Sequence, residues 1–535
     1  MEKRLISALA ISILIILAFQ YLTVKPRPEP AAVIPAENVA AQPVSAIPSA
    51  KQITAAALPE QDIVAETDRH AVTFSNIGGA VKSIRLKEFR SQPGDEPLEV
   101  VSIRDQADYL FNIDATGAAP GQANNLSLAA YEKRREPDGV TYFLKTPDWE
   151  VTKRYILRNS MQGIELQLSI KNVSAAARPM SYRMVGGSGV TERTAEARQF
   201  IETVSSIDGK LVTYRKSKDG RVITPGAVKW SAVKNKYFSV ILKPLIACKE
   251  QFCGEGADGI PVSGVGVDAG TIQPGASVEN RFVLYVGPSH IPELQKFGYG
   301  LEETVNYGFF GGISKALIAV MRFFYSLVHS WGLAIILLSI FLNIILFPLT
   351  MKSFQSMQKM QALHPQMEKL KKLHKDNPQK LNKDIMELYK KYKINPLGGC
   401  LPMLLQMPIF IALYQALMKS IELRSSGFLW IRDLSMPDAV RIPVTLPLIG
   451  NSVNILPLIM IVAMVFQQKM SSKTMGAAVT DEQKQQQKMM LIIMPIMFGF
   501  IFYTMPSGLV LYWVVNTTMT IIEQAAVMKN AATEA

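Results

Sequence analysis

The chain has 535 residues, of which 48% are apolar and only 19% are charged. Soluble proteins usually carry about 25% charged residues, and the mean hydropathy here is +0.15. This composition excludes a disordered, collagen-like or disulfide-stapled chain and favours a protein with part of its length in a membrane. The net charge of +13 is concentrated between apolar segments. It therefore indicates membrane topology and argues against DNA binding, which needs a basic face on a soluble module.

The chain begins with Lys3 and Arg4 before an apolar stretch over 5–24. Twenty helical residues span about 30 Å, the thickness of the hydrocarbon core. No small-x-small site follows, so an uncleaved signal anchor over 1–24 is favoured over a cleaved signal peptide. The Pro- and Ala-rich segment 25–55 predicts an extended linker that cannot bury a core.

Residues 56–304 show a period-two pattern, as in the clean alternation of 164–170. Gly and Asn residues separate many such runs, which predicts one large antiparallel β-sandwich on the outer side of the membrane. Cys248 and Cys253 are spaced C-x4-C in this region. A short-loop disulfide is one interpretation outside the cytoplasm, whereas a metal site is disfavoured because no His pair accompanies them.

The apolar pattern that follows predicts a membrane domain. Residues 305–330 combine apolar residues with Lys315 and Arg322, which indicates an amphipathic helix on the outer membrane surface. With the anchor, we expect six transmembrane helices, the second to sixth over 331–351, 399–424, 453–469, 489–504 and 507–528. The segments between and after them are 352–398, 425–452, 470–488 and a short tail, 529–535.

The charges of the connecting segments predict the orientation of these helices. Residues 352–398 hold 11 Lys against 4 acidic residues, whereas Arg432 and Arg441 balance Asp433 and Asp438 in 425–452. Positive segments stay on the inner side. The sequence therefore predicts that both termini lie inside.

The inner segment 352–398 repeats apolar residues every three or four positions on both sides of Asn377-Pro378. This predicts an antiparallel helical hairpin with a basic outer face. Its lysines either only set topology, or they form a mobile arm that contacts anionic headgroups, ribosomal RNA or an emerging chain. The candidate contact residues are Lys369, Lys371, Lys372, Lys390 and Lys391.

Three predicted spans carry polar residues, which are costly in a membrane unless they face a cavity or another helix. Ser339 and Asn343 share one helix face, Gln406 lies in the third span, and Tyr512, Trp513 and Asn516 lie in the sixth. These residues predict either ordinary interhelical hydrogen bonds or a hydrated groove. Glu523 lies near the inner end of the sixth span, where we expect it to reach water.

Methionine is concentrated in the same half, with 20 of the 25 Met residues between 351 and 535. Flexible Met side chains suit a surface that accepts varied apolar partners, although generic lipid-facing filler is the alternative. No nucleophile–base arrangement, paired intramembrane carboxylates or phosphate loop is recognisable. The sequence therefore predicts a protein that is not an enzyme and needs no cofactor or metal.

Several motifs carry a resemblance to a known family. They are Phe347-Pro-Leu-Thr350, Asn395-Pro-Leu-Gly-Gly-Cys400, Gln406-Met-Pro-Ile-Phe410, Leu429-Trp-Ile-Arg-Asp-Leu434 and Pro506-Ser-Gly-Leu-Val-Leu-Tyr512. In this order they closely resemble the YidC family of membrane protein insertases, Gram-negative type. The resemblance covers the whole chain and implies a bacterial inner-membrane protein with a periplasmic β-supersandwich domain, an N-terminal anchor and a five-helix insertase core.

The resemblance also implies an activity and a site. Family members insert nascent membrane proteins into the bilayer, alone or with the Sec translocon, contact the ribosome transiently and assist folding. Their core forms a hydrophilic groove open to the cytoplasm and to lipid. Carried onto this chain, the substrate groove comprises Ser339, Asn343, Gln406, Tyr512, Trp513 and Asn516. Asn343 stands where the family usually has Arg, so the groove loses a fixed positive charge.

Two other functions remain compatible with the residues alone. A small-solute transporter with an outer sugar-binding domain predicts internal repeats, and none is visible between the two halves of the core. A structural scaffold for the translocon predicts that substitutions in the groove do nothing while the protein stays folded.

Overall fold

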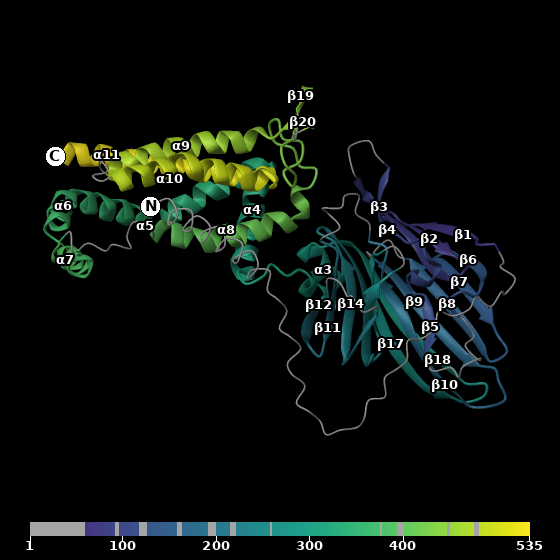
Figure 1. Ribbon diagram of the computed structural model, residues 1–535. Coiled ribbons are helices and arrows are strands. Elements are labelled where there is room, and N and C mark those ends of the chain that lie inside the picture. The colour runs from purple at the N-terminus through teal and green to yellow at the C-terminus, as the bar shows by residue number, and fades with distance from the viewer. Residues whose placement is uncertain are drawn as a thin grey trace. The chain divides into compact units, whose positions relative to one another are not determined.

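The computed structural model describes residues 59–90, 96–116, 126–157, 163–190, 200–214, 221–256, 259–374, 377–392, 401–446, 450–475 and 481–534 (Figure 1). The predicted anchor over 1–24 and linker over 25–55 lie outside these residues.

The N-terminal part of the described chain consists of antiparallel sheets, as the alternating pattern predicts. A nine-stranded sheet has the order β12 (Lys210–Tyr214), β11 (Glu202–Ile207), β14 (Val228–Lys234), β15 (Phe238–Pro244), β18 (Ser277–Pro288), β9 (Gly163–Asn172), β8 (Trp149–Leu157), β7 (Gly139–Lys145) and β6 (Glu132–Glu136). A five-stranded sheet has the order β13 (Val222–Pro225), β16 (Glu250–Glu255), β17 (Pro261–Ile272), β10 (Arg178–Gly187) and β5 (Ile113–Thr116). A four-stranded sheet follows chain order: β1 (Asp62–Glu66), β2 (His70–Ser75), β3 (Ala80–Arg90) and β4 (Pro97–Ser102).

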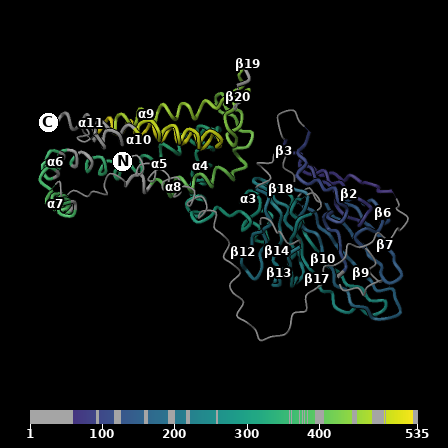
Figure 2. The backbone as a smooth tube through the Cα atoms, in the orientation of Figure 1, coloured from purple at the N-terminus to yellow at the C-terminus, as the bar shows by residue number. Residues whose placement is uncertain are grey.

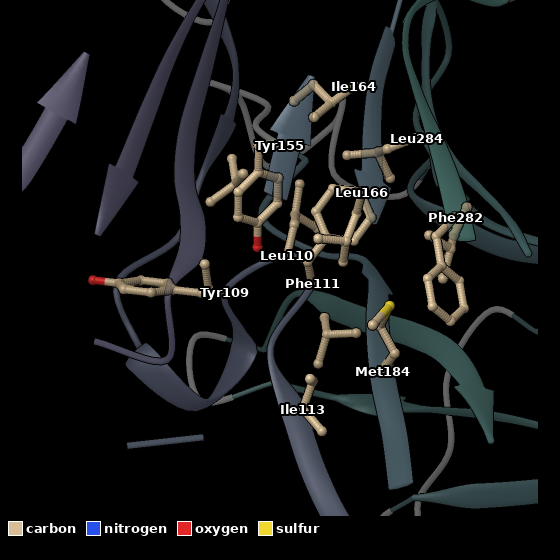
Figure 3. Packing of buried hydrophobic residues seen from close by; sticks show 14 of the residues in the cluster. Tyr109, Leu110, Phe111, Ile113, Tyr155, Ile164, Leu166, Met184, Phe282 and Leu284 are labelled. Carbon is tan, nitrogen blue, oxygen red and sulfur yellow. The ribbon is translucent and has the colours of Figure 1, made fainter. Parts of the chain in front are cut away.

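The core of this domain follows from the alternation along the strands. In β9 every second side chain is buried, and Leu166 lies between Tyr155 of β8 and Phe282 of β18. Figure 3 shows these residues gathered with Met184, which comes from β10 of the five-stranded sheet. Side chains from different sheets therefore form one hydrophobic core, as expected when each sheet buries one face.

The two cysteines do not form the disulfide considered from their spacing. Both are buried thiols, and no disulfide joins them in the described part of the chain. Cys253 pairs with Val222 and Ser263 in the extended strand β16. Extended chain covers about 3.3 Å per residue, so the residues of β16 before Cys253 separate it from Cys248, which precedes the strand. Burial also raises the pKa of the Cys248 thiol to about 12.

Helices dominate the C-terminal part, after α3 (Ile291–Phe297) and the short η2 (Leu301–Thr304). They are α4 (Gly311–Val328), α5 (Trp331–Ala362), α6 (His364–Leu373), α7 (Pro378–Lys391), α8 (Leu401–Lys419), α9 (Ile455–Met475), α10 (Asp481–Phe502) and α11 (Ser507–Glu534). The short η4 (Ile421–Leu423) and the hairpin of β19 (Val440–Leu446) and β20 (Gly450–Val453) lie between α8 and α9. Helices α9, α10 and α11 run side by side in both views (Figures 1 and 2), and α11 also packs on α5.

Two helical segments are long and apolar enough to cross a membrane within the described residues, Gly311–Val328 and Trp331–Ser356. Ile455–Ser471 and Leu491–Phe502 are shorter apolar segments. On α4 the buried residues are Ser314, Leu317, Ile318 and Met321, which share one face at helical spacing.

Several helix ends differ from the predicted boundaries. Helix α5 continues through the predicted end of the second span at 351 and reaches Ala362, so the span and the start of the inner hairpin are one helix. Helix α9 extends to Met475, and α10 begins at Asp481. The predicted inner loop over 470–488 is therefore largely an extension of these two helices. Hydropathy marks only the apolar part of a helix, whereas backbone hydrogen bonds continue into its polar turns.

Candidate functional site in the helical domain

Two amides from distant parts of the chain meet between α5 and α11. Asn343 Nδ2 donates to Asn516 Oδ1 at 3.0 Å and to the Ser339 carbonyl at 2.8 Å. The Asn343 side chain is only 7% exposed. Buried amides are stable when they are hydrogen-bonded, so this pair joins the two helices at a polar point.

Ser339 follows the same face of α5 one turn earlier. Its hydroxyl donates to the Ile335 carbonyl at 2.7 Å, and the residue is fully buried. A hydroxyl that is satisfied within its own helix is compatible with an apolar environment. The structure thus places Ser339 beside the Asn343–Asn516 pair, with its hydroxyl turned to the backbone.

A second polar contact joins α8 to α11. Gln406 Nε2 donates to the Tyr512 hydroxyl at 2.6 Å, and Tyr512 is fully buried. Tyr512 and Asn516 lie four residues apart and share one face of α11. One helix face therefore contacts the polar side chains of α5 and α8.

Trp513 lies elsewhere, although it is adjacent to Tyr512 in the sequence. Its ring stacks on Phe498 at 5.6 Å and also contacts Phe410 and Phe502 at 5.0 and 5.1 Å. These aromatic residues come from α8 and α10. Trp513 is therefore part of an aromatic cluster, whereas the other five predicted groove residues make the polar contacts.

An exposed apolar face lies on α10, next to this aromatic cluster in the sequence. Ile492, Ile493, Ile496 and Phe500 are all exposed and recur at helical spacing. Met407 of α8 is also exposed. Such a face is suited to contact with lipid tails or with another apolar helix.

The inner hairpin consists of α6 and α7, joined by a contact between His374 Nε2 and Asp384 Oδ2 at 2.8 Å. Tyr389 also donates its hydroxyl to Met367 Sδ at 3.5 Å. Four of the predicted contact lysines are exposed, namely Lys369, Lys372, Lys390 and Lys391, whereas the side chain of Lys371 lies outside the described residues. The hairpin therefore presents a basic surface.

Glu523 differs from the expectation that it reaches water. Its side chain is only 6% exposed, although it lies on α11 near the C-terminal end of the chain. A position near a helix end suggested exposure, but the side chain is buried, and α11 packs against α5 and α9. The sequence did contain a signal for this burial. Glu523 follows Asn516 by seven positions, or about two helical turns, so both residues lie on the same face of the helix.

A charged cluster that sequence reasoning missed lies outside the apolar helices. Glu422 Oε1 accepts from Arg322 Nε and Nη2 at 2.9 and 2.6 Å and lies 3.2 Å from His290 Nε2. His290 Nδ1 is 3.6 Å from Glu293. The available signal was the single Arg within the apolar pattern of 305–330. Its partner is 100 positions away in the chain, which no spacing predicts.

The pKa values of this cluster reflect the ion pairs. Burial acts to lower the pKa of His290, but Glu293 and Glu422 outweigh it and raise the pKa to about 9. Burial acts to raise the pKa of Glu422, but the contacts with His290 and Ser420 and the Arg322 charge hold it well below its ordinary value. The cluster therefore holds its charged form at neutral pH.

Known proteins similar to this chain share both parts of its architecture. The family model for the YidC periplasmic domain matches residues 62–320, and the model for the 60Kd inner membrane protein matches 323–534. The chain is 33% identical over 557 residues to the membrane protein insertase YidC of Geotalea daltonii, with 99% of both chains covered. It is 34% identical over 564 residues to that of Geobacter metallireducens, again with 99% of both covered.

A crystal structure of an active YidC insertase with its first transmembrane domain resolved is also similar, at 20% identity and a TM-score of 0.37, covering 88% of this chain and 92% of the other. The sequence identity to named insertases over nearly the full length of both chains decides the assignment. The chain belongs to the YidC family of membrane protein insertases.

Proposed function

We propose that this insertase moves nascent membrane proteins into the bilayer along the polar side chains between α5, α8 and α11, without covalent chemistry. The observation that carries the proposal is the amide pair between the buried Asn343 and the half-buried Asn516. Its donors and acceptors match those of a peptide backbone or a polar side chain. An entering polar segment can therefore exchange hydrogen bonds with the pair instead of losing them.

The energetic benefit comes from shortening the apolar path. A charged side chain at the membrane centre costs about 2.5–3.5 kcal/mol by insertion scales. Each 1.4 kcal/mol removed from the barrier speeds transfer about tenfold. A hydrated groove around Ser339, Asn343, Gln406, Tyr512 and Asn516, open to the cytoplasm and to lipid, supplies this reduction.

The apolar segment of the substrate takes a different route. It slides along the exposed face of α10 that includes Ile496 and Phe500, and along Met407 of α8, into the lipid. The aromatic cluster around Trp513 supports this side of the path. Partition of the apolar segment into lipid supplies the driving force.

The charge pattern and the family resemblance support the proposed orientation and partners. Six spans place both termini in the cytoplasm and the β-domain, predicted over 56–304, in the periplasm of the inner membrane. The exposed lysines of α6 and α7 meet the nascent chain, the ribosome or anionic headgroups first. The protein works alone or with the Sec translocon and assists the folding of inserted segments.

The test is a double-variant series in liposomes that contain the full-length protein and a single-span substrate. Asn343→Leu and Asn516→Leu each leave an amide without its partner, whereas the double variant replaces both by apolar groups. Replacing both partners of a hydrogen bond is close to neutral for stability. If polarity drives insertion, the double variant folds but inserts the substrate roughly tenfold more slowly.

Thr518→Val is the matched control, because it removes an exposed hydroxyl from α11 that donates to the Val514 carbonyl of the same helix. It should insert at the native rate. Native-like insertion by the folded double variant would reduce the amide pair to ordinary packing. If the native protein inserts the substrate no better than empty liposomes do, this result would favour the scaffold function instead.

A further inference from the structure

Glu523 is a buried carboxyl that the insertion path described above does not use. Its side chain is 6% exposed, and no hydrogen bond or ion pair joins it to another residue in the described part of the chain. The adjacent Gln524 donates to Ser471 Oγ of α9 at 3.0 Å. Gln524 therefore faces α9, and Glu523 lies about 100° further around the helix.

The helical spacing assigns Glu523 to the polar face of α11. Tyr512, Asn516 and Glu523 follow at intervals of four and seven residues, so they lie on one face. The first contacts Gln406 of α8, and the second contacts Asn343 of α5. Glu523 continues this face about 10 Å further along the axis, toward the C-terminal end of the helix.

Most of the polar side chains along this proposed path are uncharged. Ser339, Asn343, Gln406 and Asn516 carry no charge, and Asn343 supplies an amide, not a cation. Glu523 adds a single carboxyl to them. Burying an ionisable side chain in a membrane domain without a partner is costly. Such a side chain therefore indicates a functional group, and its partner has to be identified.

We propose that Glu523 selects the charge of the entering segment, by pairing with a Lys or Arg side chain in its polar flank. This inference rests on the proposed function and deepens it. A cation beside Glu523 pairs with a carboxylate that has no ion pair in the described part of the chain, whereas an acidic flank meets a like charge. The result is a preference for basic over acidic flanks, because specificity is the difference between an attraction and a repulsion.

The experiment compares three substrates in liposomes that contain the full-length protein. The substrates share one apolar segment and differ in a flank with two Lys, two Asn or two Asp residues. For the native protein we expect the Lys flank to insert faster than the Asp flank. Glu523→Gln keeps the size of the side chain and should lower the ratio of the two rates roughly tenfold. Glu523→Lys should reverse the preference.

Glu387→Gln is the matched control, because it makes the same chemical change at an exposed site on α7. It should leave the ratio unchanged. A carbodiimide, which couples a carboxyl to an adjacent amine, should also link the stalled Lys flank to Glu523, as mass spectrometry would show. This readout does not depend on the rate of insertion.

Two results would overturn the inference in distinguishable ways. If the Asn-flank substrate inserts normally and the ratio is the same in the native, Gln and Lys proteins, Glu523 is a packing residue and the proposed function stands. If the Asn-flank substrate inserts no better than in empty liposomes, the proposed function fails and the charge selection fails with it.

Discussion

Lys153 is buried in the middle of the β-domain core. It occupies an inward position of β8, its side chain is 0% exposed, and its Nζ donates to the carbonyls of Gly78 and Phe111 at 2.7 and 2.8 Å. Both acceptors have positive φ, at 68° and 64°. Burial lowers the pKa of Lys153 to about 7. At the scale of one residue, this side chain holds two turns with unusual backbone conformations against a strand.

Replacing Lys153 by Met should therefore destabilise the protein strongly. The variant keeps the length of the side chain but leaves two buried carbonyls without a donor, at about 1–3 kcal/mol each. We expect the free energy of unfolding to fall by about 3 kcal/mol, measured by denaturant unfolding of the full-length protein in detergent.

Lys171→Met is the control for that measurement, because Lys171 is exposed on the neighbouring strand β9. It should change stability by less than about 0.5 kcal/mol. An equal loss in both variants would mean that the carbonyl contacts of Lys153 contribute nothing specific.

Helix α5 shows how one element joins two regions of different polarity. Its 32 residues span about 48 Å, whereas the hydrocarbon core is about 30 Å thick. Pro348 lies within it, and the chain then enters the basic hairpin of α6 and α7. A helix of this length carries the polar contacts of Ser339 and Asn343 in the same rigid element that leads to the hairpin.

The hairpin lysines should make insertion dependent on anionic lipid. Replacing Lys369, Lys372, Lys390 and Lys391 by Gln removes four exposed charges, each worth about 1 kcal/mol near an anionic surface. We expect slower insertion into liposomes with anionic lipid and a weaker dependence of the rate on salt concentration. The rate in neutral liposomes should change little.

The matched control replaces four exposed lysines of the β-domain by Gln, namely Lys133, Lys171, Lys210 and Lys249. The net charge changes equally, so an equal effect on insertion would assign the dependence to total charge and not to the hairpin.

At the scale of the molecule, the strands and helices from Pro59 onward form one compact unit. The cluster of His290, Arg322 and Glu422 joins three segments of this unit, namely the residue before α3, helix α4 and the short η4 after α8. Arg424 also lies over the Tyr237 and Phe238 rings, at 5.6 and 5.2 Å. Charge and aromatic contacts therefore link the end of the β-domain to the helical part.

This link should weaken at alkaline pH. His290 has its pKa raised from 6.5 to about 9, so its stabilising effect is complete below pH 6.5 and is lost as the pH rises through 9. We expect hydrogen exchange around α3 and η4 to accelerate between pH 7 and pH 9.5, after correction for intrinsic rates.

Glu422→Gln removes the carboxylate that His290 faces across the link. The variant should exchange faster at pH 7 and show a smaller change with pH. If the native protein and the variant show the same dependence of hydrogen exchange on pH, His290 is not the group that titrates.

Local patterns predicted much of the fold because they depend on near neighbours in the chain. Alternation along β9 predicted a strand with one buried face, and the i, i+4 spacing of Ser339 and Asn343 predicted a shared helix face. Hydropathy located the apolar helices but missed their polar ends at Ala362 and Asp481. The C-x4-C spacing suggested a disulfide, whereas in the structure both cysteines are free thiols and Cys253 is paired in a strand.

The sequence alone determined which residue types this protein can use: polar side chains on three apolar helices, a basic inner segment and an alternating β-rich domain. The tertiary structure decided which of them meet. Asn343 pairs with Asn516 across 173 positions, Arg322 with Glu422 across 100, and Lys153 with two distant turns. Periodicity specifies the face of an element, but the packing of whole elements chooses the neighbour of that face, since burial and hydrogen bonding are satisfied only in three dimensions.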